Sequence, residues 1–150
     1  MSQAPQSEQW PLLSSETEAL GASFLVVASQ PRAFAETFYA RLFELAPGVR
    51  SLFPTDLQAQ QEKFAQTLST IVSFVDEPLV LLSGLRQLGA RHNAYGALPA
   101  HYAVVGEALL HTLETCSGTG LTAPARQAWR RLYGWIVAEM LSGAQANTPQ

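Results

Sequence analysis

The sequence predicts an all-α protein of about seven helices. Apolar residues recur at spacings of three and four throughout the chain, and no segment shows the sustained alternation that is typical of a β-strand. Prolines stand just before several of these apolar stretches, where they often begin helices. No internal repeat and no glycine-rich phosphate loop interrupts the pattern. A single helical domain therefore explains the sequence best.

The first half of the chain predicts two helices and a short helical turn. The capping-box pattern of Ser15 and Glu18 predicts a helix over residues 15–28. A proline begins the next helix, which covers residues 31–45. Two further prolines bracket a short helical turn within residues 47–54.

Four longer helices follow. We expect them to be opened by Asp56, Pro78, Pro99 and Thr122 with Pro124, and to extend to about Val75, Asn93, Leu113 and Met140. The segment 118–120 predicts a loop, and Gly143 predicts the end of the last helix. We therefore expect one domain over residues 15–143, with a flexible N-terminal segment at 1–14 and a flexible tail at 144–150.

Composition excludes several classes of function. The net charge of −3, with nine scattered lysines and arginines, argues against a nucleic-acid partner. Cys116 is the sole cysteine, so an internal disulfide and a cysteine-based zinc cluster are excluded. Residues 1–13 lack the features of a signal peptide, and no apolar run approaches the ~18 residues of a membrane span. We expect a cytoplasmic protein without a membrane partner; the low charged fraction of 14% fits a monomer or a homodimer.

His92 is the main candidate for a metal ligand. It lies near the end of the helix predicted over residues 79–93, where an imidazole aimed at the interior can offer a neutral nitrogen to a metal. A lone histidine is more often a surface residue or a satisfied core residue. The interpretation of His92 therefore depends on the rest of the chain.

Other side chains could form a site opposite His92. Tyr39 stands where the core pattern of its helix would accept an apolar residue, and Phe53 lies in a corner between short helices. Gln60 precedes Phe64 by four residues, so the two share a helix face. Each has a structural alternative: Tyr39 as a core tyrosine bonded to a helix carbonyl, Gln60 as part of a solvated run, and both phenylalanines as plain core.

Five segments together carry a family resemblance. They are FYARLF at 38–43, APGVRSLFP at 46–54, LGARH at 88–92, HYAVVGEALL at 101–110 and AWRRLYG at 128–134. The chain resembles the single-domain bacterial haemoglobins and is similar to the globin domain of flavohaemoglobins, over roughly residues 15–141. The resemblance implies a globin fold whose helices sandwich haem b. No Cys-x-x-Cys-His motif occurs, so that haem would be bound non-covalently.

The resemblance also implies roles for individual residues. His92 matches the proximal iron ligand, and Phe53 matches the corner phenylalanine that stacks on the porphyrin. Tyr39 and Gln60 match the distal tyrosine and glutamine, and Phe64 matches the distal apolar position. The other residues that we expect at the haem are Leu88, Tyr95, Tyr102, Val105 and Leu109.

The chemistry of these residue types agrees with such roles. A dioxygen ligand carries partial negative charge, and a phenol or carboxamide donor would stabilise it by about 1–3 kcal/mol where water is excluded. The second nitrogen of His92 needs an acceptor that fixes the ring, and we expect a backbone carbonyl in the turn 85–88. Lys63 and Arg91 are candidates to pair with haem propionates, although surface positions explain them equally well. His101 and His111 are not expected to be ligands.

One departure from the flavohaemoglobin pattern bears on function. Those globin domains place a tyrosine and a glutamate behind the proximal histidine; Tyr102 matches the tyrosine, but the glutamate position falls on Ala144. Glu139 lies more than a turn earlier and does not match. The sequence therefore favours reversible binding of dioxygen and other diatomic gases, for storage, delivery or scavenging, over oxidative turnover. The alternatives are a nitric oxide dioxygenase that depends on a separate reductase, and a gas sensor, which would usually carry a signalling domain.

Overall fold

The computed structural model describes residues 12–117 and 121–146. Within them the chain forms only helices, so the predicted fold class is confirmed. The elements are α2 (Ser14–Ala28), α3 (Pro31–Leu45), the 3₁₀-helix η1 (Pro47–Leu52), α4 (Gln58–Ser73), α5 (Leu79–Ala94), α6 (Pro99–Ser117) and α7 (Ala123–Ala146). The loop expected at 118–120 lies outside the described residues. The division into segments 1–14, 15–143 and 144–150 stays a prediction.

One of the predicted helix starts differs in detail from the structure. The capping interaction of α2 is made by Glu16, whose Oε1 accepts a hydrogen bond from the N–H of Leu13 at 3.0 Å, so the prediction of Ser15 with Glu18 is wrong. The helix begins one residue earlier than expected, which moves the capping position by two residues. Asp56 does accept a hydrogen bond from the N–H of Gln58, at 3.0 Å.

The last helix does not end at Gly143. It continues to Ala146, because Gly143 lies where α7 touches the backbone of α5. A Cβ atom at Gly143 would lie 2.0 Å from the carbonyl oxygen of Arg86. This glycine therefore serves close packing rather than helix termination. At the other end of the helix, the Thr122 hydroxyl accepts a hydrogen bond from the N–H of Ala125 at 3.2 Å, as the predicted start requires.

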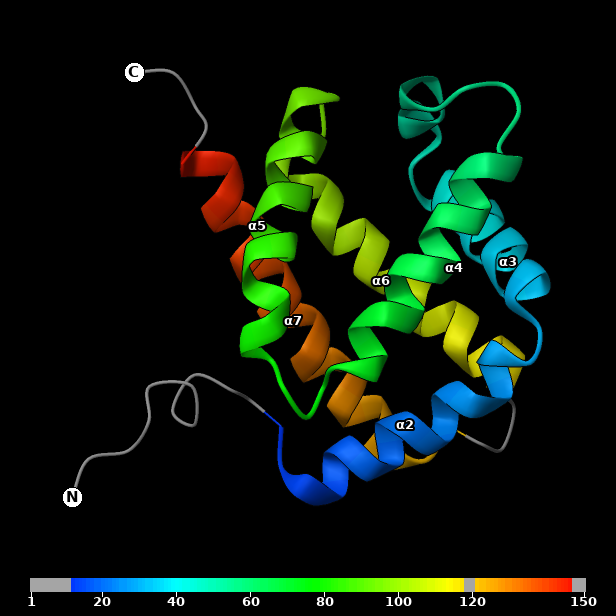
Figure 1. Cartoon of the computed structure of the whole chain (residues 1–150). Helices are drawn as coiled ribbons and strands as arrows, with labels where there is room; N and C mark the ends of the chain where they lie inside the picture. Colours follow the sequence, from blue (N-terminus) through cyan, green and yellow to red (C-terminus); the bar gives the residue numbers. More distant parts are fainter. Residues whose placement is uncertain (1–11, 118–120, 147–150) are drawn as a thin grey trace.

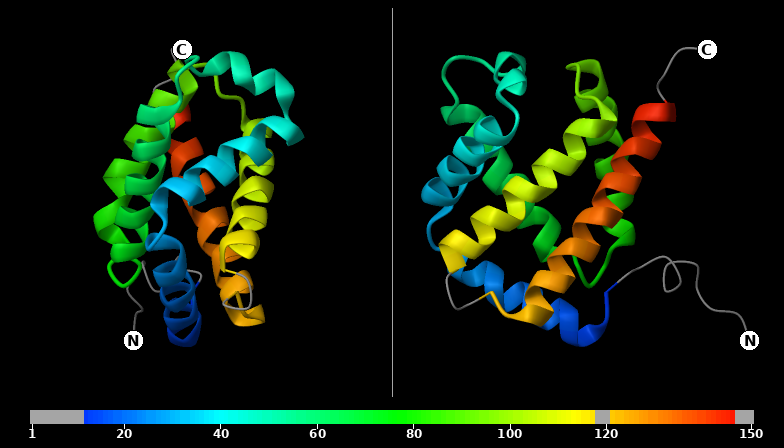
Figure 2. Two further views of the ribbon diagram at one scale, coloured as in Figure 1. Left: turned by 90° about the vertical axis from the view of Figure 1, so that its right-hand side faces the viewer. Right: turned by 180° about the vertical axis from the view of Figure 1, so that it is seen from behind.

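The packing of the helices separates two neighbours in the chain. Helix α4 packs on α3, which also packs on α6, whereas α5 packs most extensively on α7. Helices α4 and α5 lie apart from one another, both in front of α6 (Figure 1), and the view turned by 90° shows the two on the same side of α6 (Figure 2). Helix α2 closes one end by packing on α7 and α6. No helix in the described ranges has the length and apolarity to cross a bilayer.

A buried hydrogen-bond chain joins α2 to α7. The indole N–H of Trp129 donates to the hydroxyl of Ser23 at 2.9 Å, and that hydroxyl donates to the carbonyl of Leu20 at 2.7 Å. Trp129 and Ser23 are each 1% exposed. Nearer the surface, Glu16 and Arg131 approach to 3.5 Å. These contacts fasten α2 to α7.

Candidate functional site

Tyr39 is the centre of an aromatic cluster at the meeting point of α3, α4 and the corner after η1. Its ring contacts those of Phe38, Phe43, Phe53 and Phe64, with centroids 5.0, 5.9, 5.5 and 5.7 Å away. Three of these contacts are edge-on, which is the arrangement that aromatic quadrupoles favour. The structure thus brings Tyr39, Phe53 and Phe64 together, as the sequence predicts.

A hydrogen bond joins the two polar members of this region. The amide nitrogen of Gln60 donates to the phenol oxygen of Tyr39 at 3.1 Å. Burial raises the pKa of the Tyr39 phenol, and the bond from Gln60 opposes that shift. The phenol is therefore protonated at neutral pH. Its oxygen accepts from Gln60, so its single O–H remains able to donate to another group.

Arg50 holds the corner that carries Phe53. Its guanidinium donates hydrogen bonds to the carbonyl oxygens of Phe53, Pro54 and Thr55 at 3.3, 2.9 and 3.0 Å. The same guanidinium lies over the ring of Phe43, 5.2 Å from its centroid. One side chain thus satisfies three successive carbonyl groups that no helix can use. Arg50 could not be singled out from the sequence, because its spacing alone does not reveal these partners.

His92 lies on α5, a different helix from those that carry this cluster. Its Nδ1 is 2.9 Å from the carbonyl oxygen of Leu88, one turn earlier. A carbonyl only accepts, so Nδ1 must carry the proton in this bond. Burial lowers the pKa of His92; the bond to Leu88 opposes this shift, and the charge of Arg91 adds to it. The imidazole is therefore neutral at neutral pH, and its Nε2 presents a lone pair.

The remaining residues expected at the site differ in exposure. Leu88 and Val105 are half-buried, while Leu109 and Tyr102 are buried. Tyr95 is 69% exposed and follows the last residue of α5. It therefore lies at the rim of the α5–α6 connection rather than in the core. The incomplete burial of the apolar residues among them leaves surface that a ligand could cover.

The position at which a carboxylate is expected behind His92 holds none, and the tyrosine expected there, Tyr102, contacts Tyr133. The hydroxyl of Tyr133 donates to the backbone carbonyl of Tyr102, and burial raises the pKa of both phenols. Ala144 is buried on α7 and has no ionisable group. Glu139 pairs with Arg86 at 3.0 Å instead. Among the described residues no hydrogen bond joins the Tyr102 phenol to His92, whose Nδ1 is taken by Leu88.

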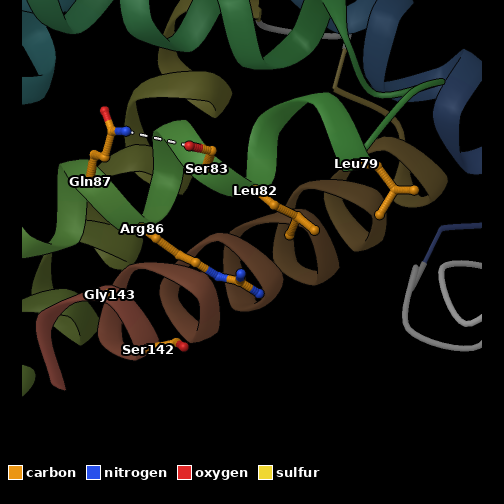
Figure 3. A pocket seen from close by; sticks show the side chains of 7 residues that line it. All are labelled: Leu79, Leu82, Ser83, Arg86, Gln87, Ser142 and Gly143. Carbon is orange, nitrogen blue, oxygen red and sulfur yellow. Dashed lines mark hydrogen bonds between the residues drawn. The ribbon is translucent and has the colours of Figure 1, made fainter. Parts of the chain in front are cut away.

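An open groove of about 530 Å³ lies elsewhere, between the outer faces of α5 and α7 (Figure 3). Its lining includes Leu79, Leu82, Arg86 and Ser142. None of the residues expected to contact haem lines this groove. The residues with distinctive chemistry lie elsewhere: Gln60 and Tyr39 are joined by a hydrogen bond, and His92 on α5 has its Nδ1 bonded to the Leu88 carbonyl. These residues, rather than the groove, are the candidate functional site.

Comparison with known proteins agrees with the fold. A sequence model described as Globin matches residues 36–140. Neuroglobin-2 of Oncorhynchus mykiss is 35% identical, over 73% of this chain and 77% of that protein. Among solved structures, an engineered carbene transferase, derived from a protein of Rhodothermus marinus described as a nitric oxide dioxygenase, is 25% identical. It superposes with a TM-score of 0.81 over 91% of this chain and 95% of its own.

A more distant likeness concerns the fold alone. A hexacoordinated haem protein from an anhydrobiotic tardigrade is 18% identical, with a TM-score of 0.80 over 92% of this chain and 98% of its own. The finer likeness to bacterial single-domain haemoglobins and flavohaemoglobins, expected from the sequence motifs, stays a prediction.

Proposed function

Since this chain belongs to the globin family, we propose that it binds haem b non-covalently between α4 and α5, with His92 as the axial ligand. The observation that carries the proposal is the hydrogen bond from Nδ1 of His92 to the carbonyl of Leu88 at 2.9 Å. This bond fixes the tautomer and the ring orientation, and it leaves Nε2 free to coordinate iron. Donation of the Nδ1 proton to the Leu88 carbonyl also makes Nε2 a better electron-pair donor to a metal.

The residues present fit such a group. One imidazole does not hold iron by itself, but a porphyrin brings its own ring nitrogens and needs only an axial ligand. Half-buried apolar side chains stand on both sides of the proposed site: Phe53 and Phe64 near α4, and Leu88 and Val105 from α5 and α6. A flat apolar ring would complete their burial, at about 25 cal/mol per Å² of apolar surface removed from water. Tyr95, Tyr102 and Leu109 complete the proposed set.

On the opposite side from His92, Tyr39 is the proposed direct hydrogen-bond donor to the gas. When bound, haem iron supplies the reversible binding of dioxygen, carbon monoxide or nitric oxide. Tyr39 is 4% exposed, and its phenol keeps its proton because burial raises its pKa. Gln60 holds the phenol oxygen, so the O–H can turn towards a ligand while water stays excluded. Gln60 then acts mainly by positioning Tyr39.

Reversible binding of dioxygen, for storage, delivery or scavenging, is the proposed role. A carboxylate behind the axial histidine would make the imidazole more basic and would favour oxidative chemistry. The position expected for that carboxylate is Ala144, which has no ionisable group. The nearby Glu139 forms an ion pair with Arg86 instead. The basicity of the His92 imidazole is therefore set by the Leu88 carbonyl, which is a weaker hydrogen-bond acceptor than a carboxylate.

An absorption spectrum of the purified protein tests the proposal. We expect an intense band near the violet after haem is supplied, shifting when the reduced protein meets carbon monoxide. His92→Ala should lose this spectrum. His101→Ala is the matched control, because His101 is also half-buried but uses its Nδ1 to accept from the N–H of Leu98 at 3.0 Å. Absence of the band from the wild-type protein would contradict the proposal.

A second candidate function is nitric oxide dioxygenase activity. The structural likeness to the Rhodothermus marinus protein described as such an enzyme favours it. The same distal pair, Tyr39 and Gln60, would serve, but each turnover needs an electron from a separate reductase. Sustained conversion of nitric oxide and dioxygen to nitrate, with a reductase supplied, would place this function first. A rate no higher than that of free haem would exclude it.

A further inference from the structure

Helices α5 and α7 touch backbone to backbone at two glycines, one from each helix. A Cβ atom at Gly89 of α5 would lie 1.8 Å from the carbonyl oxygen of Met140, and one at Gly143 of α7 would lie 2.0 Å from that of Arg86. We call these two contacts the glycine clasp. Figure 3 shows the half of it in which Arg86 and Gly143 face one another. The clasp thus joins the two helices that pack most extensively in this domain.

Other glycines of the same helices show that the clasp is specific. A Cβ atom at Gly84 of α5 or at Gly134 of α7 would meet nothing within 4 Å. Glycine destabilises a helix interior relative to alanine unless close packing requires it. Gly89 and Gly143 meet this condition, because no side chain can fit between the two backbones.

The clasp lies within one helical turn of the proposed iron ligand. Gly89 is three residues before His92 and directly follows Leu88, whose carbonyl orients the imidazole. Since these residues share one continuous helix, the position of α5 against α7 fixes where the imidazole stands. We infer that Gly89 and Gly143 are positioning residues for His92, holding α5 at the depth that axial coordination requires. This inference rests on the proposed haem function.

A single methyl group should disturb this arrangement. A carbon and a carbonyl oxygen need about 3.3 Å between them, so alanine at Gly89 must open the contact by roughly 1.5 Å. The contacting atoms are backbone, which cannot turn aside as a flexible side chain could. Helix α5 has to shift and carry His92 with it. Displacements of about 1 Å can change the function of a site by ~100-fold, so we expect gas affinity to change at least tenfold.

The experiment compares Gly89→Ala and Gly143→Ala with the matched controls Gly84→Ala and Gly134→Ala in the haem-loaded protein. The readouts are the iron–histidine stretching frequency of the reduced protein and the rate of carbon monoxide release. We expect both clasp variants to shift the frequency and to change the rate at least tenfold, while both controls match the wild type. Clasp variants that also match the wild type would overturn the inference.

A second measurement separates positioning from general loss of structure. In a His92→Gly background, imidazole added from solution can act as an axial ligand that is not attached to α5. Adding Gly89→Ala should then leave the frequency and the rate as they are in His92→Gly alone. An equal shift in both backgrounds would show that the methyl group acts elsewhere, and would overturn the inference. If Gly89→Ala does not fold, Gly143→Ala decides, because it lies near the end of α7.

A failure of the proposed function looks different. A wild-type protein that does not bind haem contradicts the proposed function itself. If the wild-type protein binds haem but the clasp variants have the same spectrum as the wild type, only the inference about the glycine clasp is contradicted.

Discussion

Tyr39→Phe removes one oxygen atom from the centre of the proposed gas-binding pocket. The ring can keep its contacts with Phe38, Phe53 and Phe64, because phenylalanine has the same shape. The substitution therefore tests the hydroxyl rather than the packing. Two interactions disappear with it: the bond from Gln60 at 3.1 Å and the proposed donation to the gas.

The size of the effect follows from burial. A hydrogen bond to a partly charged ligand is worth about 1–3 kcal/mol, which corresponds to about 5- to 150-fold in affinity. Tyr39 is 4% exposed, so its donor acts with little competition from water and belongs in the upper half of that range. We expect dioxygen to leave Tyr39→Phe at least tenfold faster. Carbon monoxide, which carries less negative charge, should leave at nearly the wild-type rate.

Stopped-flow measurement of dioxygen and carbon monoxide release gives both rates. Gln60→Leu is the companion variant: Gln60 is half-buried and holds Tyr39, so its effect should be smaller. The double variant should lose less than the product of the two single effects, because both act through one hydrogen bond. Dioxygen release within about twofold of wild type in the double variant would refute the reasoning, since a twofold change is below the range of one hydrogen bond.

Two further predictions concern stability. Ser23→Ala should lower the free energy of unfolding by about 1–3 kcal/mol, because it strands the buried indole N–H of Trp129, whereas the exposed Ser29→Ala should change it far less; equal effects in urea titrations would contradict this. The raised phenol pKa values of Tyr39 and Tyr102 mean that the folded state holds these protons more tightly than the unfolded state does. The stabilisation that these two phenols give the folded state should be complete below pH about 10 and should fall as the pH rises through their pKa values in the folded protein. An unfolding free energy that stays constant above pH about 10 would contradict this.

The helical architecture could be predicted from the sequence because apolar spacing and prolines act locally. The helix at 31–45 follows from a proline and a three–four pattern, and the structure gives the same bounds. The end of α7 could not be predicted this way. Gly143 has the same sequence signal whether it ends a helix or lets two backbones touch, and only the position of Arg86 on another helix decides.

The candidate site shows the same limit. The motifs bring Tyr39, Gln60 and His92 to attention, and the acceptor for His92 could be expected one turn earlier on its own helix, as found at Leu88. The three carbonyl partners of Arg50 depend on how the corner after η1 folds back, which no spacing in the sequence encodes. Likewise the bond between Gln60 and Tyr39 joins residues 21 positions apart in sequence.

Vibrational spectroscopy of the reduced, ligand-free haem protein tests the central claim most directly. Its iron–histidine stretching band should move when the protein is produced with histidine labelled with heavy nitrogen. The band should vanish in His92→Gly, return when imidazole is added, and stay unchanged in His101→Ala. A band that survives in His92→Gly without imidazole would show that another group holds the iron, and would contradict the proposed role of His92 as the axial ligand.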